Sequence, residues 1–556
     1  MDSARSHATA AVIRDGTFAW VGDDEDVDEV LAALEGPHSG RARRVDLEGR
    51  RVLPGLIDAH THPGLVTGSK DVFLLRRSHD LAEILAAVAR EVRETPGTGL
   101  LKGGYFPIEL FGLTGPRRET LDHATGDRPV VLYDDSGHSQ WCNTAALGLL
   151  GINEQTQDPA PGMSVYVRDP DGRPTGWTKE FALQPLLRGL RSGPMQPPAE
   201  LEAFLRYLVS RGVVALLDGG SQDAEPVVYE ALAEMEREGR LPLRYEGAVH
   251  VTLPEQVATA PDVLLDLRAR FGGDRLRFNT VKLVFDGVTE VGTAAMLDPY
   301  RDPRAGRGAT LVDGDAFEQL VLRMHAIGAN LHLHTVGDAA VRTALDAVER
   351  AHAIVGARDN LRTIVSLSHI EVVHPDDIER FARLGVIANF TPHWYGGYFE
   401  GAEPWLGTER YRRMYQVRSL LDAGAVVACS SDITDHVEWT TGRADPFLGM
   451  EIGHRRLEPA DAEAEEAEAA AEADDARTPR SPADERVPLE ALIRGYTLAA
   501  AQQMGIDADH GAIAPGRRAS LVVLDRDILE IPPAQVHAVN PVAVLVDGEL
   551  VAGSLD

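Results

Sequence analysis

The chain has 556 residues, of which 44% are hydrophobic and 25% charged, a balance typical of a large globular protein and not of a disordered one. The formal net charge of −31 argues against nucleic acid and anionic membranes as partners, because both are polyanions. Cys142 and Cys429 are the only cysteines, so neither a disulfide framework nor a thiolate metal site is expected. The sequence has no apolar signal segment and no apolar run of membrane-spanning length, so we expect a cytoplasmic protein.

The two ends of the chain carry the same kind of pattern. Residues 8–54 contain short apolar runs separated by Asp15-Gly16, which is a hairpin signal. Residues 508–556 repeat the pattern around Asp547-Gly548. We therefore predict that residues 1–54 and 508–556 form one small β-sandwich domain, with a large α/β body over residues 55–507.

Two insertions are predicted within this body. Residues 65–210 combine a helical pattern over 80–95 with Gly-, Pro- and aromatic-rich loops, and we expect them to form a lid that shapes a substrate pocket. Residues 456–486 are rich in Ala, Glu and Asp. This composition fits an acidic docking segment or a solvated insertion, and we favour the solvated insertion.

The first strand of the body carries two histidines. Leu56 and Ile57 follow a Pro-Gly break and predict a short buried strand that ends at His60 and His62. Side chains two residues apart in a strand point to the same side, so both imidazoles can reach one metal ion.

From residue 210 onward, short β-rich runs alternate with helical stretches, which is typical of βα units on a parallel sheet. The predicted strands are 213–218, 243–251, 280–285, 330–334, 363–369, 386–390 and 426–432. With the first strand they make eight, which predicts a (β/α)8 TIM-like barrel whose active site lies at the C-terminal ends of the strands.

Further candidate ligands fall in or at the ends of these strands. They are Lys282, His334, His369 and Asp432. Together with His60 and His62 they would form a nitrogen and oxygen donor set of the kind that binds zinc. For Lys282 alone, an ordinary barrel-interior lysine paired with an acid is the alternative.

The order His-x-His, Lys, His, His, Asp on eight strands resembles the amidohydrolase superfamily of metal-dependent hydrolases. Within it, the chain is most similar to the amidohydrolase-3 branch, which includes YtcJ-like and N-substituted formamide deformylase-like proteins. The stretches that carry the resemblance are Ser-Gly-His-Ser-Gln-Trp-Cys-Asn at 136–143, Asp-Gly-Arg-Pro-Thr-Gly-Trp-Thr-Lys-Glu at 171–180, His-Thr-Val-Gly-Asp at 334–338 and Asp-Pro-Phe at 445–447.

The resemblance implies a binuclear centre. His60, His62 and Asp432 would hold the more buried ion, and His334 and His369 would hold the second. Lys282 matches the lysine that is carboxylated in such enzymes, and its carbamate would bridge both ions. We expect two divalent ions, with zinc as the first choice, although this donor set also accepts manganese, iron, cobalt or nickel.

The implied activity is hydrolysis of a non-peptide C–N bond in a small molecule, such as an N-substituted formamide, by a metal-bridged hydroxide. Asp432 would accept the proton and return it to the leaving nitrogen. The same site could instead support ester or lactone hydrolysis, deamination or isomerisation. A non-catalytic binding or regulatory protein is a further alternative, but it would be expected to lack a ligand, and all six positions are filled. A homodimer is compatible with the sequence.

Several residues outside the ligand set are candidates for substrate contact. They are His138, Tyr105, Trp177, His393 and Trp394, all expected in the lid or in loops at the barrel mouth. For each of them, packing within the protein is the alternative. We interpret His332 as a packed neighbour of the ligands, and Asn143 and Glu180 as residues that fix lid loops.

Overall fold

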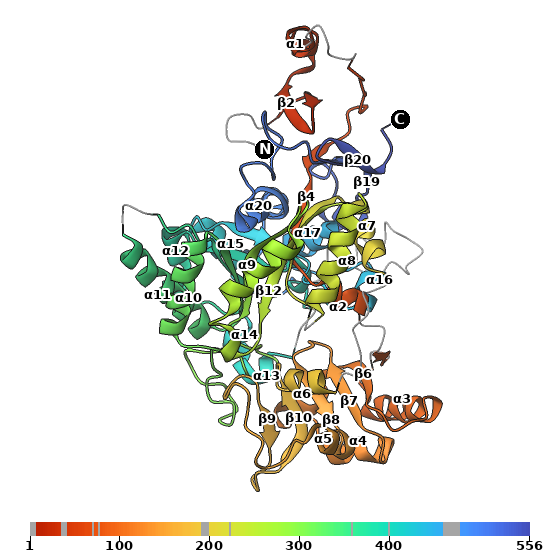
Figure 1. The fold of residues 1–556 in the computed structure, drawn as a ribbon, viewed down its shortest axis with the longest axis vertical. Helices are drawn as coiled ribbons and strands as arrows, with labels where there is room; N and C mark the ends of the chain where they lie inside the picture. The colour runs from red at the N-terminus through yellow and green to blue at the C-terminus, as the bar shows by residue number, and fades with distance from the viewer. Residues whose placement is uncertain are drawn as a thin grey trace.

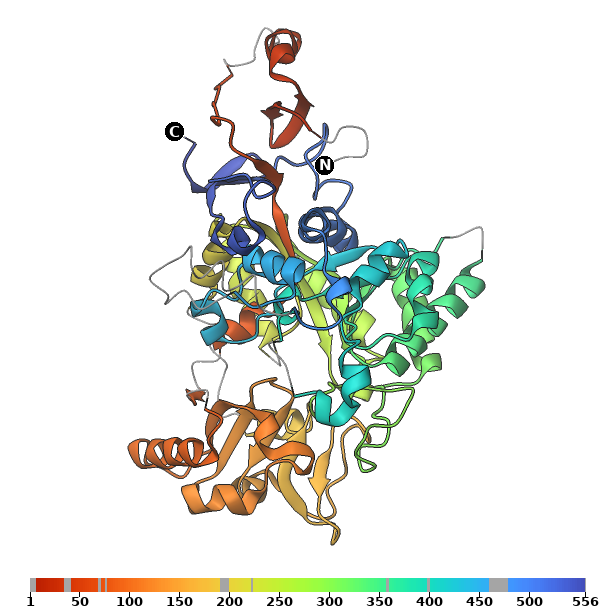
Figure 2. The same ribbon diagram turned by 180° about the vertical axis from the view of Figure 1, so that it is seen from behind.

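The computed structural model describes residues 7–34, 42–68, 72–75, 78–190, 200–221, 224–356, 360–397, 401–459 and 479–555. Three parts follow one another along the long axis of the molecule (Figures 1 and 2). Strands from both chain ends lie at the top, a barrel lies in the middle, and the segment that follows the first barrel strand lies at the bottom.

Within the described residues, the middle part is a barrel of eight parallel strands in the order β17-β16-β15-β14-β13-β12-β11-β4. The strands are β4 (Leu56–Thr61), β11 (Val213–Asp218), β12 (Arg244–Val251), β13 (Leu276–Val284), β14 (Asn330–Thr335), β15 (Val365–His369), β16 (Ile387–Phe390) and β17 (Val427–Cys429). The predicted barrel is therefore confirmed. Its last strand is shorter than predicted, since β17 ends three residues before Asp432.

Backbone hydrogen bonds close the barrel between its last and first strands. The Asp432 N–H donates to the His60 carbonyl at 2.9 Å, and the His62 N–H donates to the Ile433 carbonyl at 3.2 Å. The buried carboxylate of Asp58 accepts from the Ser431 N–H at 3.0 Å and from the Ser431 hydroxyl at 2.6 Å. This seam therefore places the loop after β17 directly beside the histidines of β4.

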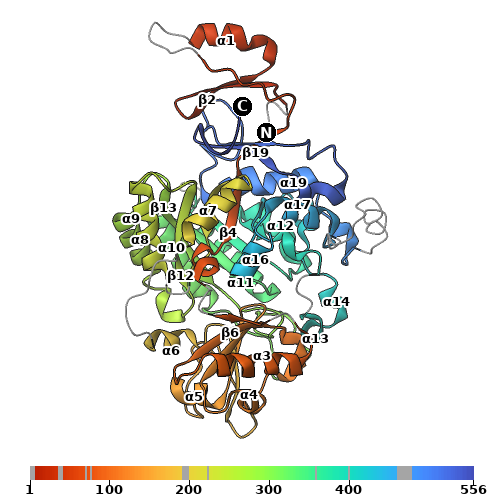
Figure 3. The ribbon, with the colours of Figure 1, turned by 90° about the vertical axis from the view of Figure 1, so that its right-hand side faces the viewer.

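Helices cover the barrel strands on both sides (Figure 3). They are α7 (Leu201–Ser210), α8 (Glu225–Arg237), α9 (Ala260–Phe271), α10 (Gly314–Ile327), α11 (Asp338–Val355), α12 (Pro375–Leu384), α15 (Val417–Asp422), α17 (Pro446–Arg455), α19 (Leu489–Arg494), the π-helical turn η7 (Gly495–Ala499) and α20 (Ala500–Met504). In α11, Val341, Leu345 and Val348 recur at helical spacing and are buried. Helix α10 begins at the Asp313 cap and ends at Gly328, which adopts a left-handed conformation.

Shorter helices lie in the loops of the barrel. They are α2 (Pro63–Gly68), η4 (Pro254–Gln256), η5 (Pro392–Trp394), α13 (Glu403–Leu406), α14 (Thr408–Tyr411), α16 (His436–Thr440) and η6 (Ala483–Glu485). Of these, α2 follows β4 and α16 follows the loop after β17 that carries Asp432, so these two lie at the end of the barrel at which the candidate ligands lie.

The two chain ends pair with each other. Strands β18 (Leu521–Leu524), β19 (Pro541–Val546) and β20 (Glu549–Gly553) form an antiparallel sheet whose other edge is β3 (Val52–Pro54). Strands β1 (Ala10–Arg14) and β2 (Thr17–Gly22) form the predicted hairpin across Asp15-Gly16, both with positive φ. The segments at the two chain ends also contain the short helices η1 (Asp24–Asp26), α1 (Val27–Leu34) and η8 (Pro533–Ala538).

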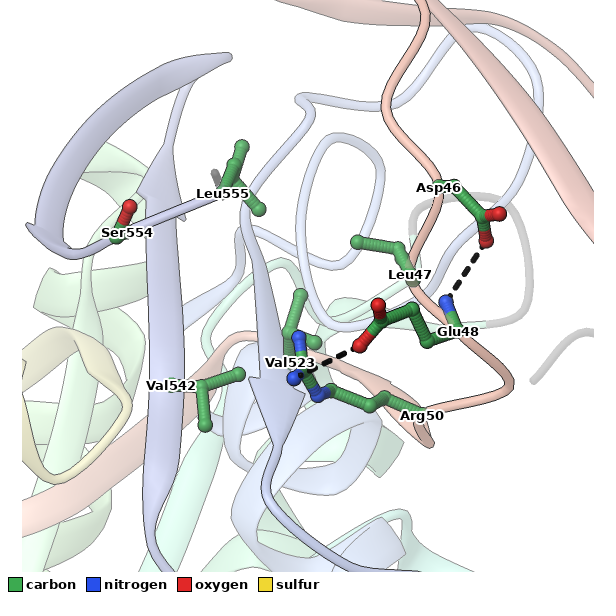
Figure 4. A pocket seen from close by; sticks show the side chains of 8 residues that line it. All are labelled: Asp46, Leu47, Glu48, Arg50, Val523, Val542, Ser554 and Leu555. Carbon is green, nitrogen blue, oxygen red and sulfur yellow. Dashed lines mark hydrogen bonds and ion pairs between the residues drawn. The ribbon is translucent and has the colours of Figure 1, made fainter.

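A small cavity of about 70 Å³ lies in the terminal part (Figure 4). Its walls come from the segment around Glu48 and Arg50, which form an ion pair at 3.2 Å, and from Val523 and Val542 of the sheet. The segment 46–50 and the sheet belong to the end of the molecule opposite the insertion, so this cavity is separate from the candidate ligands (Figure 1).

The insertion forms a sheet with helices, whereas the sequence suggested mostly loops. Its role as a lid that shapes a substrate pocket stays a prediction. Its described strands run in the order β5-β6-β7-β8-β10-β9. Its elements are β5 (Phe73–Leu74), α3 (Leu81–Glu94), β6 (Leu101–Phe106), η3 (Ile108–Thr114), α4 (Arg118–Thr125), β7 (Val130–Asp134), β8 (Ser139–Cys142), α5 (Thr144–Leu150), β9 (Tyr166–Arg168), β10 (Pro174–Lys179) and α6 (Gln184–Gly189). The predicted helix is found as α3. The glycines favoured loops in the sequence, whereas Gly103 lies in a strand and packs against the Phe73 ring, which a Cβ at this position would approach to 2.2 Å.

The acidic stretch lies mostly outside the described residues, since 460–478 are not among them. Its described ends lie side by side, because the Arg480 N–H donates to the Arg456 carbonyl at 2.9 Å. The buried guanidinium of Arg456 also donates to the Tyr415 carbonyl at 3.2 Å. Among the residues that the structure describes, no helix has both the length and the apolar character needed to cross a membrane.

The seam of the barrel gives a stability prediction. Replacing Asp58 with Ala leaves the buried Ser431 N–H without its acceptor, which should cost about 1–3 kcal/mol. We expect a lower melting temperature in scanning calorimetry, whereas Asp171→Ala at an exposed turn should leave it unchanged. Equal melting temperatures for Asp58→Ala and the unsubstituted protein would contradict this role of Asp58.

Candidate metal centre

Strand β4 presents two imidazoles to one carboxylate. His60 and His62 lie on one face of the strand, and their Nε2 atoms lie 3.5 and 3.1 Å from Asp432 Oδ1. The other ring nitrogen of His62 contacts the backbone, with Nδ1 2.8 Å from the Gly220 carbonyl oxygen. One ligand-type atom from each of these three side chains lies within 4.8 Å of the others, which is a spacing that one metal ion can span.

The backbone at the site adopts conformations that side chains rarely favour. Asp432 has φ of 49° and His369 has φ of 75°, both in the left-handed region. His369 is the last residue of β15 and Asp432 lies three residues after β17, and Asp432 Oδ2 lies 3.5 Å from His369 Nδ1. Such conformations cost free energy and cluster at functional sites. The presence of two of them in one cluster therefore supports a functional site here.

Lys282 reaches the cluster from β13. Its Nζ lies 3.0 Å from His60 Nε2 and 3.3 Å from the Ser368 hydroxyl, and the side chain is buried. Burial lowers the pKa of Lys282 to about 7, although the nearby Asp432 carboxylate opposes this shift. A large fraction of the amine is therefore uncharged near neutral pH.

His334 and His369 complete the set from β14 and β15, with ring centroids 4.4 Å apart. Burial, supported by nearby Lys282, lowers the pKa of His60, His334 and His369 well below the usual value, so all three rings are neutral. Among the described residues, no hydrogen-bond partner is found for the buried atoms His60 Nδ1, His334 Nε2 and His369 Nδ1. Neutral imidazoles with unpartnered buried nitrogens, next to a carboxylate, fit a divalent metal ion.

His332 also lies among these residues, and among the described residues no hydrogen-bond partner is found for its buried Nε2. Its Nδ1 lies 2.8 Å from the Ser366 hydroxyl, and its ring packs edge-on against His60 at 4.7 Å. This packing is consistent with a neighbour of the ligands, and that role of His332 stays a prediction.

Two predicted substrate contacts lie at the cluster. The His138 ring, from the insertion, lies 5.2 Å from the His334 ring, and its Nδ1 lies 2.6 Å from Glu180 Oε2. Burial opposes charge on His138, but Glu180 outweighs it and raises the pKa of His138 to about 9. Trp394 stacks on His369 at 5.3 Å with an interplanar angle of 19°.

The other three predicted contacts are Tyr105, Trp177 and His393. Tyr105 is partly buried at the end of β6, where burial and the carboxylates of Asp435 and Glu438 raise its pKa. Trp177 is buried, with Lys179 Nζ 4.2 Å from its ring centroid. His393 is also buried, and its Nε2 lies 2.9 Å from the Asp445 carbonyl oxygen. Both side chains are enclosed by protein, but among the described residues no hydrogen-bond partner is found for Trp177 Nε1 or His393 Nδ1, so their substrate contact stays a prediction.

Sequence reasoning missed Asp58, and it interpreted Glu180 only as a residue that fixes lid loops. Asp58 shares the strand parity of His60 and His62, and this spacing of two was a signal that could have been used. The importance of Glu180 was harder to find, because it depends on the packing of the insertion against the barrel. A charged residue at the end of a buried strand was the available hint.

The chain matches the family model described as the amidohydrolase family over residues 43–552. It therefore belongs to this family, and the resemblance inferred from the motifs is confirmed.

Individual proteins agree with this assignment. N-substituted formamide deformylase of Arthrobacter pascens is 26% identical over 568 residues, covering 99% of this chain and 96% of that protein. Exoenzymes regulatory protein AepA of Pectobacterium carotovorum subsp. carotovorum is 27% identical over 395 residues, covering 70% of this chain and 82% of that protein. The crystal structure of an uncharacterized metal-dependent hydrolase from Pyrococcus furiosus matches with a TM-score of 0.61 and 25% identity, covering 93% of this chain and 95% of that chain. These matches support a metal-dependent hydrolase.

Metal binding should stabilise the protein if the cluster is a metal site. At a free zinc concentration about a hundred times the dissociation constant, the expected gain is about 2.7 kcal/mol. Thermal melting of chelator-treated protein should therefore shift upward on adding zinc. His60→Gln should reduce this shift, whereas His352→Gln at the exposed face of α11 should retain it. Equal shifts for both variants would contradict the site.

Proposed function

We propose that this protein is an amidohydrolase that cleaves a non-peptide C–N bond in a small molecule. The observation that carries the proposal is the convergence of His60, His62, His334, His369 and Asp432 at the C-terminal ends of the barrel strands. In barrels of this kind, that end is where active sites lie.

We infer that the cluster holds two divalent ions, with zinc the first choice for this donor set. His60, His62 and Asp432 would hold one ion, and His334 and His369 would hold the other. Lys282 would bridge them as a carbamate, formed when its neutral amine adds to carbon dioxide and loses a proton. The lowered pKa of Lys282 supports this assignment, because only the uncharged amine is nucleophilic.

Divalent ions at this position would lower the pKa of a bound water and polarise a substrate carbonyl. Asp432 is the residue placed to move the proton, since its two oxygens face His62 on one side and His369 on the other. It would accept a proton from the attacking water and return it to the departing nitrogen.

The type of bond that the protein cleaves is inferred from its relatives. An N-substituted formamide is the substrate named for the Arthrobacter protein, and we take small N-substituted formamides as the first substrates to test. Ester or lactone hydrolysis, deamination and isomerisation remain alternatives for the same site. A regulatory role is favoured by the name of the Pectobacterium relative, but the filled ligand set supports catalysis.

The catalytic role of Asp432 can be tested directly. With zinc-loaded protein and a panel of N-alkyl and N-aryl formamides, Asp432→Asn should lower kcat by about 10²–10⁴-fold, because the proton transfer is lost. The exposed Asp376→Asn should retain kcat. Turnover of the panel by Asp432→Asn at the rate of the unsubstituted protein would overturn the assignment.

A further inference from the structure

His332 lies inside the barrel, two residues before the candidate ligand His334 on the same strand. It is the strand partner of Lys282 on one side and of Ser366 on the other, and paired residues of neighbouring strands point to the same face of the sheet. Its ring is buried and packs edge-on against His60 at 4.7 Å. His332 is therefore a neighbour of both Lys282 and His60.

A polar network across the barrel fixes the orientation of Gln503 in α20. The Ala59 carbonyl oxygen can only accept a hydrogen bond, so the Gln503 atom that lies 2.7 Å from it is the amide nitrogen. The Gln503 amide oxygen accepts from the Asn389 amide at 2.9 Å, which agrees with this orientation. The two ends of this amide are therefore distinguished by their partners.

The orientation of Gln503 decides which nitrogen of His332 carries hydrogen. The same Gln503 nitrogen lies 3.4 Å from His332 Nδ1, so a hydrogen on Nδ1 would face another donor. Nδ1 therefore accepts, and the Ser366 hydroxyl, 2.8 Å from it and 3.3 Å from the Leu331 carbonyl oxygen, donates to it. An imidazole whose Nδ1 accepts carries its hydrogen on Nε2.

This donor is buried, and in the described part of the chain no acceptor is found for it. His60 Nδ1 does not qualify, because a ring that binds a metal through Nε2 carries its hydrogen on Nδ1. Lys282 Nζ lies 3.0 Å from His60 Nε2 and 3.3 Å from the Ser368 hydroxyl. A lysine ammonium is a donor only, whereas a carbamate on the same nitrogen carries two oxygens that accept.

We propose that His332 Nε2 donates a hydrogen bond to the carbamate of Lys282 and thereby stabilises the carboxylated lysine, and that Gln503 is the positioning residue for this donor. The inference rests on the proposed bridging role of Lys282. The carbamate forms when Nζ of the neutral amine bonds to the carbon of carbon dioxide and one N–H proton passes to solvent. A hydrogen bond to a charged acceptor should favour it about 10–100-fold.

A histidine that only fills the barrel interior would behave differently. Such a role needs the volume of the ring and not its hydrogen, and a buried water would accept from Nε2. The contacts of Gln503 and Ser366 with Nδ1 would then only satisfy that nitrogen. A substitution that keeps the volume and removes the donor separates the two roles.

The test uses four variants. His332→Phe keeps a ring without a donor. His332→Gln carries its amide nitrogen at about the distance of Nε2, whereas the shorter His332→Asn reaches only the position of Nδ1. Gln503→Met removes the amide that orients His332. His352→Phe and Gln535→Met, at exposed positions, are the matched controls.

Two readouts report on Lys282 without measuring turnover. Chelator-treated protein is loaded with zinc over a series of concentrations of bicarbonate labelled with the NMR-active carbon isotope. The first readout is the carbamate signal in the carbon NMR spectrum, which must be absent from Lys282→Ala. The second is the zinc content per chain after free zinc has been removed.

We expect His332→Phe and His332→Asn to need about 10–100-fold more bicarbonate than the unsubstituted protein for half of the maximal carbamate signal. His332→Gln should stay within about threefold, because it keeps a donor at the position of Nε2. Gln503→Met should lie between these values, since Nδ1 can then carry the hydrogen. Zinc content at low bicarbonate should fall in the same order, and the controls should match the unsubstituted protein.

Half of the maximal signal at the same bicarbonate concentration in His332→Phe as in the unsubstituted protein would overturn the inference. Equal losses in His332→Gln and His332→Asn would also overturn it, because they would report packing. If His332→Phe does not fold, the comparison of these two variants carries the test.

The outcomes separate this inference from the proposed function. If no carbamate forms on the unsubstituted protein, the bridging role of Lys282 fails and the inference fails with it. If a carbamate forms and depends on His332 but no formamide is hydrolysed, the amidase proposal fails and the inference stands. If formamides are hydrolysed and the carbamate does not depend on His332, the inference fails and the amidase proposal stands.

Discussion

The seam between β17 and β4 is the interaction on which the site depends. Asp58 in the first barrel strand accepts two hydrogen bonds from Ser431, and the Asp432 N–H donates to the His60 carbonyl. These bonds bring together residues separated by more than 370 positions in the sequence. Burying so many imidazoles and carboxylates is costly, and the closed barrel offsets part of that cost through hydrogen bonds at fixed positions.

The insertion builds the other wall of the site. Its sheet docks on the barrel through Lys179, whose Nζ donates to the Val291 carbonyl at 2.6 Å beneath the Trp177 ring. Glu180, the next residue, is held by the same barrel loop. The barrel therefore supplies the candidate metal donors, and the insertion supplies His138 at their edge.

Much of the barrel and of the ligand set could be predicted because the signals are local. Strand periodicity predicts that His60 and His62 point to the same side of their strand. The positions of His334 and His369 at the ends of neighbouring parallel strands predict that they lie close together. The sheet of the insertion could not be predicted, because Gly103 appears in the sequence as a loop residue and is explained only by the Phe73 ring. His393 and Trp177 were candidates because they were expected in the lid or in loops at the barrel mouth, and only tertiary packing shows that they are enclosed.

The metal content of the purified protein tests the central claim most directly. Elemental analysis of protein prepared without chelator should give about two divalent ions per chain, as expected for a bridged binuclear site. Lys282→Ala should contain fewer, because the bridging carbamate cannot form, whereas Lys102→Ala should match the unsubstituted protein. No bound metal in any of these proteins after zinc supplementation would contradict a metal-dependent hydrolase. A metal content in Lys282→Ala equal to that of the unsubstituted protein would contradict a bridging role for Lys282.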